Sequence, residues 1–425
     1  MDKILITAIG DRDPYIEGDG KGPILTAVDE LKPNEVYLVY TAPPAKSHKE
    51  EEAFKTRDVL LSEYKVKSYL RQVLLPDPTD YDAVLNEFRR VSEEIRELPL
   101  GKEIAVSVSS GTPTMQACWL LLISQGLLPA IPYYISDPKF VEAGQPRIRQ
   151  VSVDFLREDS LMKTARQHYR TFSFYSAEQV LMELSQCCSI PDRRVGANWL
   201  AQYCRILGLW DGYRLDEATG RMRRFVKESR GLGWEKFTEP QLEVLMQLWE
   251  DQKSCEYMET SLILTDLYFN AERCLQRGHY ADTLARAWRT YEGALRWWLF
   301  NTHGIPAMTT KFPENRSQEL LEFLAKNSIY SGKNGELNRH ALETILVEFV
   351  QDQKVKSWKD GLGGFGDARN KSIIAHGTQE INEGTAQKAL KRLRQVLESC
   401  ECDLEKYPFS SQRILENEAV LFECL

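Results

Sequence analysis

The amino-acid sequence predicts an α/β domain built on a mainly parallel sheet, followed by an all-helical region. Short apolar runs alternate with helical patterns over residues 1–156, which is typical of parallel strands connected by helices. From residue 157 onward strand patterns vanish, and nearly every segment has helical spacing broken by glycine or proline. The 425 residues are too many for one ordinary core, so two or three domains are expected.

Each predicted strand is a short apolar run bounded by turn residues, and each predicted helix has apolar residues at helical spacing. The strands are expected at Lys3–Gly10, Glu35–Thr41, Ser68–Leu75 and Glu103–Ser110, and in the runs PAIPYYIS (129–136) and RIRQVSVDFL (147–156). The helices between them are expected at Pro23–Leu31, His48–Tyr64, Tyr81–Leu98 and Thr112–Gln125. This alternation favours a Rossmann-like sheet with helices on both faces.

One segment of the helical region, ADTLARAWRTYEGALRWWLF, carries a continuous apolar stripe. Its members recur every three or four residues, and we interpret the stripe as core rather than as a base-stacking surface. They are Leu284, Trp288, Tyr291, Leu295 and Trp298. The glycine-rich run Gly361–Asp367 is expected to be a flexible loop that leads into another helix.

The charge balance excludes a protein that holds polyanions by diffuse attraction, because 54 Lys and Arg face 62 Asp and Glu, for a net charge of -8. The nine cysteines lack the CxxC spacing of a metal site, which predicts reduced thiols in an intracellular protein. The N-terminus meets acidic residues too early for a signal peptide, and polar residues and prolines interrupt the most apolar stretch, Ala117–Ile135. We therefore expect a cytoplasmic protein with no membrane span and no metal.

A polar turn follows the predicted strand Glu103–Ser110 and opens the next helix. Serine and threonine can cap that helix, and glycine lets a ligand approach the backbone, so free N–H groups and the helix dipole favour an anion or phosphate. The candidate ligand-binding residues here are Ser109, Ser110, Gly111 and Thr112. A well-capped helix without a ligand is the alternative.

The first strand ends in a second polar loop, which supplies the candidates Gly10, Asp11 and Arg12. In a Rossmann-like strand order this loop lies beside the Ser-Gly-Thr turn, at the edge where such sheets bind ligands. Arg12 is then a partner for a phosphate or a base, or it pairs with Asp11 or Asp13. Neither loop matches GxGxxG or a Walker A motif, which disfavours ordinary dinucleotide and ATP chemistry.

With its strand–SxGTxxM–helix turn, the N-terminal domain resembles the CARF domains of CRISPR-associated proteins over about 155 residues. The resemblance implies that the ligand is a cyclic oligoadenylate, bound across a homodimer by the two loops. A twofold dimer suits a ring-shaped ligand, because it arranges two copies of each loop around one axis.

The most informative stretch is Arg369-Asn370-Lys371-Ser372-Ile373-Ile374-Ala375-His376. Cutting RNA without a metal needs a proton-transfer group near neutrality and a fixed cation beside the phosphate, which histidine and arginine supply. If the whole stretch is helical, the Cα atoms of Arg369 and His376 are about 10.5 Å apart and the arginine leans away from the histidine. One chain then makes a poor site, whereas a twofold dimer can bring the arginine of one copy to the histidine of the other.

This R-N-x5-H spacing in an all-helical domain resembles the HEPN ribonucleases, whose R-x(4–6)-H pattern it follows at its long end. The resemblance implies that His376 is the acid/base group, that Arg369 holds the phosphate and that Asn370 orients the pair. It also implies attack by the RNA 2′-hydroxyl and a cyclic phosphate end, without a metal cofactor.

The order of the two resemblances is that of CRISPR-associated CARF–HEPN ribonucleases of the Csm and Csx type, which act on single-stranded RNA in type III CRISPR defence. The implied domains are a CARF-like sensor at 1–156, a helical connector at 157–265 and a HEPN-like ribonuclease domain at 266–425. Two alternatives stay open: a ligand-sensing regulator with an inactive helical domain, and a sensor that also cleaves its own cyclic ligand.

Weaker candidates lie elsewhere in the helical region. Glu292 either faces the catalytic cleft or forms an ion pair on the helix surface, and two basic clusters either guide RNA or are solvated faces. The clusters are Lys388, Lys391, Arg392 and Arg394, and Arg221, Arg223, Arg224 and Lys227. The remaining histidines have no partner that the sequence reveals: His48, His168, His279, His303 and His340.

Overall fold

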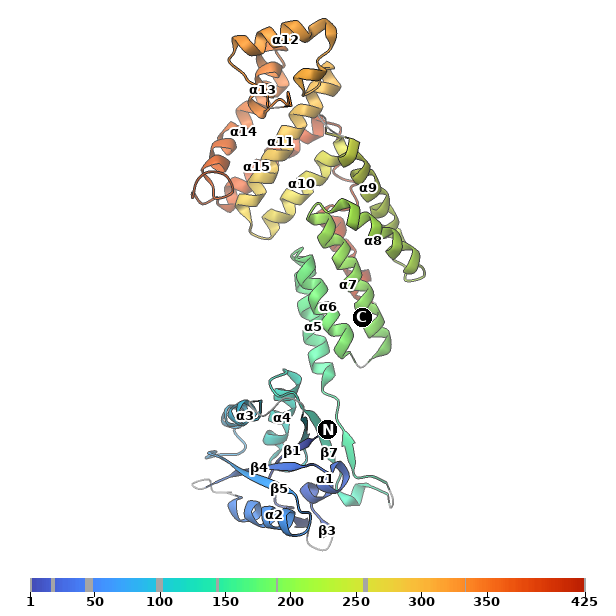
Figure 1. The fold of residues 1–425 in the computed structure, drawn as a ribbon, viewed down its shortest axis with the longest axis vertical. Coiled ribbons are helices and arrows are strands. Elements are labelled where there is room, and N and C mark those ends of the chain that lie inside the picture. The colour runs from blue at the N-terminus through green and yellow to red at the C-terminus, as the bar shows by residue number, and fades with distance from the viewer. Residues whose placement is uncertain are drawn as a thin grey trace. The chain divides into compact units, whose positions relative to one another are not determined.

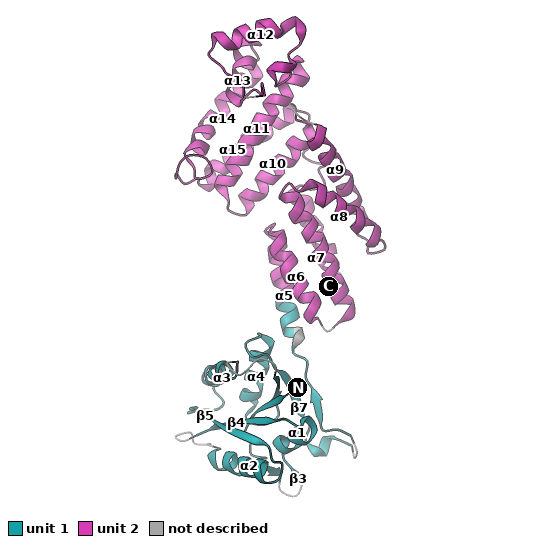
Figure 2. Cartoon of the chain, in the orientation of Figure 1, with its two compact units in different colours: residues 1–160 teal, residues 161–425 magenta. Residues whose placement is uncertain are grey.

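The computed structural model forms two compact units, residues 1–160 and residues 161–425 (Figures 1 and 2). The structure describes residues 2–16, 20–42, 49–96, 102–142, 145–188, 190–254, 259–332 and 334–423. Among them, no helix combines the length and the apolar composition that crossing a bilayer requires. The described cysteines are all free thiols.

The first unit is built on a six-stranded sheet with the strand order β5-β4-β1-β6-β7-β8 (Figure 1). The strands are β1 (Lys3–Ala8), β4 (Glu35–Thr41), β5 (Lys67–Val73), β6 (Glu103–Ser107), β7 (Ile131–Ile135) and β8 (Ile148–Gln150). Every neighbouring pair is parallel except β7 and β8. The prediction of a mainly parallel, Rossmann-like sheet is therefore confirmed.

Helices cover both faces of this sheet, because its central strands are apolar at consecutive positions. The helices are α1 (Pro23–Leu31), α2 (Glu50–Ser62), α3 (Tyr81–Arg96) and α4 (Pro113–Ser124). Ile4 and Ile6 of β1 join the core formed with α3 and α4, where the rings of Phe88 and Trp119 stack at 4.0 Å. Leu5 points to the other face and joins the core formed with α1 and α2.

The end of the first unit differs from the expected strand at 147–156. Only Ile148–Gln150 is a strand, and α5 (Asp154–Arg170) begins within the predicted run. Alternating apolar residues predicted a longer strand here, but acidic residues near the start of a helix stabilise its N-terminus and α5 has two in its first five residues. A short hairpin of β2 (Tyr15–Ile16) and β3 (Gly20–Lys21) was not anticipated.

The second unit is helical throughout its named elements, as expected, apart from one isolated β-bridge between Met308 and Glu336. Its helices after α5 are α6 (Phe174–Cys187), α7 (Pro191–Asp211), α8 (Leu215–Glu228), α9 (Glu235–Ser254), α10 (Ser261–Gln276), α11 (Tyr280–His303), α12 (Glu314–Lys326), α13 (Arg339–Thr344), α14 (Gln353–Lys371), α15 (Glu383–Ser399), α16 (Ser411–Glu416) and α17 (Glu418–Glu423).

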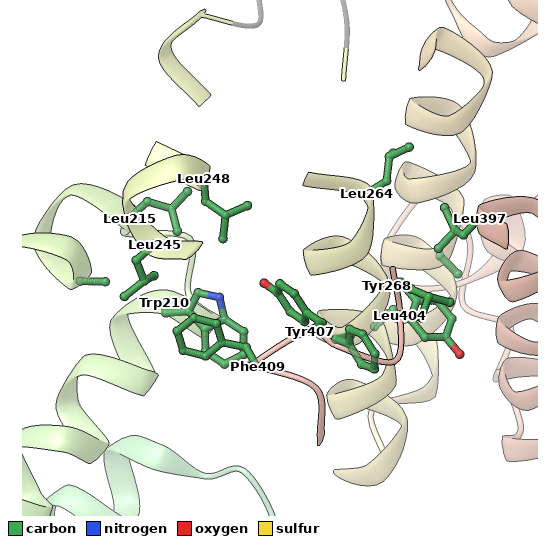
Figure 3. Packing of buried hydrophobic residues seen from close by; sticks show 14 of the residues in the cluster. Trp210, Leu215, Leu245, Leu248, Leu264, Tyr268, Leu397, Leu404, Tyr407 and Phe409 are labelled. Carbon is green, nitrogen blue, oxygen red and sulfur yellow. The ribbon is translucent and has the colours of Figure 1, made fainter. Parts of the chain in front are cut away.

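One continuous core runs through this unit, because a segment near residue 407 packs between helices that are distant in sequence (Figure 3). Phe409 stacks on Trp210 of α7 with ring centroids 4.3 Å apart, and Tyr407 stacks on Phe269 of α10 at 5.4 Å. The Trp210 indole N–H also donates to Asp266 of α10 at 2.8 Å. Residues 157–265, expected to form a connector, thus share their core with the helices that follow.

Helix α11 carries the predicted apolar stripe, and the stripe is core as expected. Leu284, Tyr291 and Leu295 are buried, whereas Trp288 and Trp298 are half-buried at the edges. The helix packs against α10, α14 and α15. It is therefore the central helix of the C-terminal part of this unit.

The glycine-rich run Gly361–Asp367 is not a loop, and the expectation of a flexible loop is wrong. It lies inside α14, which starts at Gln353. A Cβ atom on Gly366 would lie 2.5 Å from the Trp288 ring, so glycine here lets α14 approach α11 closely. Gly363 and Gly364 have open space around them. Tertiary packing therefore holds a helix that local composition disfavours.

Asp352 joins the start of α14 to α11. One carboxylate oxygen caps α14 by accepting the backbone N–H groups of Lys354 at 2.9 Å and Val355 at 3.0 Å. The other accepts the indole N–H of Trp298 at 2.8 Å and lies 2.9 Å from His303 Nε2. His303 therefore has a partner that the sequence did not reveal, 49 residues away.

We expect Gly363→Ala to stabilise the helical unit and Gly366→Ala to destabilise it. At 363 alanine gains helix propensity without a clash, by about 0.5–1 kcal/mol. At 366 the added methyl group meets Trp288 and costs about 1–3 kcal/mol. Urea unfolding of the two variants measures the difference, and equal midpoints would contradict the close packing of α14 on α11.

Candidate functional site

The two polar loops of the first unit meet because β1 and β6 are neighbouring parallel strands. Their backbones touch: a Cβ atom on Gly10 would lie 3.0 Å from the Gly111 nitrogen. Gly111 has φ +82°, and a Cβ there would approach the Ala8 Cβ and the Met115 Sδ to 2.9 Å. Only glycine fits this position without strain.

The hydroxyls of the second turn are tied to the sheet and to α4. Thr112 caps α4: its Oγ1 accepts the backbone N–H of Met115 at 3.2 Å and donates to the Pro78 carbonyl at 2.7 Å. The Ser109 hydroxyl accepts the backbone N–H of Ile135 in β7 at 2.5 Å. These contacts make the turn a fixed platform.

Two adjoining pockets, of about 250 and 270 Å³, open on either side of the contact between Gly10 and Gly111. The structure brings all seven candidate ligand residues into their walls. Gly10, Asp11, Arg12, Ser109, Ser110 and Gly111 line the first, and Thr112 lines the second together with Gly10, Asp11 and Gly111. Sequence reasoning missed several other lining residues, among them Lys49, Gln116, Tyr134, Asp137 and Arg147.

The acidic partners of the first loop lie far away in the sequence. Arg12 forms an ion pair with Asp137, not with Asp11 or Asp13 as the sequence allowed. The hydrogen bond from the Lys139 backbone N–H, together with the Arg12 guanidinium, holds the pKa of Asp137 below its usual value. Asp11 pairs with Lys49 at 2.6 Å. The pocket walls therefore contain both acidic and basic side chains.

Arg147 supplies a cation that local sequence does not reveal, because it precedes the edge strand β8. Its Nε donates to the Ser136 carbonyl at 3.1 Å, and its Nη1 donates to the Thr26 hydroxyl at 2.9 Å. Among the residues that the structure describes, it makes no ion pair. Its charge is therefore available to an anionic ligand.

Asp13 fills the place at the start of α1 where a phosphate binds in dinucleotide folds. Its buried carboxylate accepts the backbone N–H groups of Gly10 and Ile24, each at 3.1 Å. The preceding cap residue, Gly22, has no side chain to do this. Burial raises the pKa of Asp13 to about 6. The aspartate thus takes the place of the phosphate that a GxGxxG loop would hold, which agrees with the absence of that motif.

We expect the first unit to lose stability as pH rises through the titration of Asp13. Burial raises its folded-state pKa from 3.8 to about 6, so ionisation costs more in the folded than in the unfolded chain. The loss begins near pH 4, is complete above pH 6 and amounts to at most roughly 3 kcal/mol. Hydrogen exchange of the β1 amides measures it, and an Asp13→Asn variant with the same pH dependence would argue against this assignment.

In the second unit, Arg369 and Asn370 lie in the last turn of α14, which ends at Lys371. His376 is not on this helix, so the arrangement with two helical turns between arginine and histidine does not form. Instead the chain turns back: the His376 backbone N–H donates to the Asn370 carbonyl at 3.2 Å. The Ser372 hydroxyl closes the helix end by donating to the Arg369 carbonyl at 2.7 Å.

Gly377 makes this turn possible. A Cβ atom at this position would lie 2.1 Å from the Lys371 carbonyl oxygen, which no other residue could accommodate. The following chain is held by the Gln379 backbone N–H, which donates to the same carbonyl at 2.8 Å. The turn therefore keeps His376 at the end of α14, beside Asn370.

The three candidate catalytic side chains are differently exposed. Arg369 is half-buried and its Nη1 donates to Asn370 Oδ1 at 3.1 Å, while His376 is exposed. In the described part of the chain, neither Arg369 nor His376 forms an ion pair. Two apolar neighbours face solvent, Ile373 with 77% and Ile374 with 42% of its surface exposed.

The weaker candidates have ordinary surface roles. Glu292 accepts a hydrogen bond from Arg296 at 2.8 Å, the ion pair on the helix surface that the sequence allowed. The basic clusters are exposed on α8 and α15. Of their members, Arg394 pairs with Glu398 at 3.5 Å and Arg223 contacts the Trp249 ring.

Comparisons with known proteins give a family match for part of the second unit and a match in fold for the whole chain. Residues 252–402 match a family model described as the Csm6 HEPN domain. The structure of Enterococcus italicus Csm6 bound to cyclic hexa-2′-fluoro-hexa-dAMP aligns over 100% of both chains, with 17% identity and a TM-score of 0.66. A type III CRISPR defence DNA nuclease activated by cyclic oligoadenylate aligns with 48% of this chain and 34% of its own, with 16% identity and a TM-score of only 0.24. A search of curated proteins found no match.

Residues 252–402 therefore match the HEPN domain of Csm6. The whole chain, in which a Rossmann-like unit precedes a helical unit, shares the fold of the Csm6 structure. The resemblance drawn from the sequence is confirmed at this level.

Proposed function

We propose that this protein is a cytoplasmic, cyclic-oligoadenylate-activated and metal-independent endoribonuclease that cuts single-stranded RNA in type III CRISPR antiviral defence. The observation that carries the proposal is the motif at the end of α14, within the range that matches the HEPN family model. Arg369 is half-buried and pairs with no carboxylate among the described residues, and the His376 imidazole is exposed, which suits a phosphodiester substrate.

The chemistry follows from the three side chains. His376 takes the proton from the RNA 2′-hydroxyl, whose oxygen attacks the adjacent phosphorus. The bond from phosphorus to the 5′-oxygen breaks, that oxygen receives a proton, and a 2′,3′-cyclic phosphate end remains. Arg369 holds the charge that develops on the phosphoryl oxygens, and Asn370 fixes the guanidinium through their 3.1 Å hydrogen bond.

A homodimer supplies the second imidazole that one chain lacks. Ile373 and Ile374 are apolar and exposed within the catalytic turn, so a second copy that covers them gains buried apolar surface. A twofold axis through this surface surrounds one RNA strand with two copies of the motif. Two imidazoles are then available, one as base and one as acid.

The sensor pockets are suited to the activating ligand. They share Gly10, Asp11 and Gly111, so successive nucleotides of one ring can occupy both. Arg12 and Arg147 offer cations to its phosphates, and the fixed Ser-Gly-Thr turn offers backbone groups. Ligand binding at the sensor dimer then changes the geometry between the two catalytic turns, which raises the cleavage rate.

We expect His376→Ala to lower cleavage of a fluorescent single-stranded RNA by at least about 100-fold, because the proton-transfer group is lost. Arg369→Ala should cause a similar loss, and EDTA should leave the parent protein unaffected. His340→Ala, which removes an exposed histidine on α13, is the matched control. Parent-like cleavage by His376→Ala, or an obligatory divalent metal, would end the assignment.

Gly111→Ala is expected to impair activation without touching the nuclease. The added methyl group forces the turn away from Ala8 and Met115 and deforms both pockets. The concentration of cyclic oligoadenylate that gives half-maximal RNA cleavage should rise by at least about tenfold, equivalent to 1.4 kcal/mol of binding free energy. Cleavage without ligand should match the parent, and an unchanged ligand requirement would place the sensor site elsewhere.

A further inference from the structure

Besides the two pockets of the first unit, the helical unit contains a cavity of about 380 Å³ that neither the sensor nor the catalytic motif uses. It lies among α9, α10 and α11 and the chain at the start of α8. Its volume falls in the range of small-molecule sites, which combine apolar walls with a few placed polar groups. The described lining has this composition.

Four apolar side chains line the cavity. Leu215 and Leu248 are almost fully buried, and Ile263 and Leu267 come from α10. Figure 3 shows Leu215 and Leu248 close together above Trp210. Branched apolar side chains of this kind accept a flat ring among them.

Two arginines and two carboxylates line the cavity: Arg286 and Arg289 with Glu259 and Asp266. A neighbouring ion-pair cluster outside the lining joins Asp211 to Arg273 and Arg277, at 2.7 and 2.5 Å. Within the lining, Glu259 pairs with Arg289. Arg286 donates only to the amide oxygen of Asn270 and has no carboxylate within the described residues. A cation left without a counter-charge beside a cavity favours an anion in it.

Two more polar groups are available to a ligand. The hydroxyl of Tyr213 is buried in the pocket wall, where its interaction with Asp266 falls short of a regular hydrogen bond. Buried hydroxyls that lack a full hydrogen bond are uncommon, so a ligand in the cavity can supply one. Asp266 is held in place by Trp210 and Tyr407 and faces the same space.

We propose that this cavity binds a nucleoside monophosphate, separately from RNA cleavage and from the cyclic activator. Arg286 and Arg289 bind the phosphate, and the base lies among the leucines and Ile263. Tyr213 and Asp266 bind the polar edge of the base. Inorganic phosphate would leave the apolar walls empty, and a fatty acid would leave Tyr213 and Asp266 unmatched.

Titration calorimetry of the full chain with adenosine 5′-monophosphate tests the proposal. Arg286→Gln removes the unpaired cation and should weaken binding by at least about tenfold. Ile263→Trp fills the space for the base and should abolish binding while every charge stays. Arg296→Gln is the matched control, since that arginine lies on α11, pairs with Glu292 and does not line the cavity.

The sensor is the competing site for this probe, and Gly111→Ala separates the two. Binding that survives Gly111→Ala and Arg296→Gln but is lost in Ile263→Trp supports the cavity. Binding lost in Gly111→Ala alone, or no binding at millimolar probe, overturns the proposal. Adenosine that binds as tightly as the monophosphate, or inorganic phosphate that does so, overturns the assigned ligand class.

Discussion

The close contact between α11 and α14 is the constraint on which the helical unit depends. Gly366 lets α14 lie directly on the Trp288 ring, and Asp352 ties the start of α14 to Trp298 and His303. Arg369 lies in the last turn of the same helix, after both anchors. Helix α11 also contributes Arg286 and Arg289 to the lining of a cavity. Helix α11 thus contacts both the helix that carries the candidate motif and a separate cavity.

Much of the fold was predictable, because the strands of a parallel sheet are recognisable in the sequence as short apolar runs separated by helical patterns. The meeting of the Gly10 loop with the Ser-Gly-Thr turn followed from strand order alone. The partners of these loops did not, since Arg12 pairs with Asp137, which is 125 residues away. The helix over Gly361–Asp367 was missed for the same reason: its stability comes from packing on another helix, and local composition argued against it.

The first unit departs from dinucleotide-binding folds at one carboxylate. Asp13 accepts the backbone N–H of Ile24 at the start of α1 and that of Gly10 after β1, and so occupies a helix start that binds phosphate in those folds. The turn before α4 instead lies beside two arginines, Arg12 and Arg147, in the wall of the first pocket. The candidate anion site of this sheet edge therefore lies at a different helix from the one used in dinucleotide folds.

The aromatic segment around Tyr407 and Phe409 has a consequence for how the protein is made. These rings complete the core by joining α7 to α10, yet they follow every helix from α5 to α15 in the chain. A ribosome must therefore finish all of those helices before the core can close. The helices made earlier therefore stay without their full core for most of the chain's synthesis.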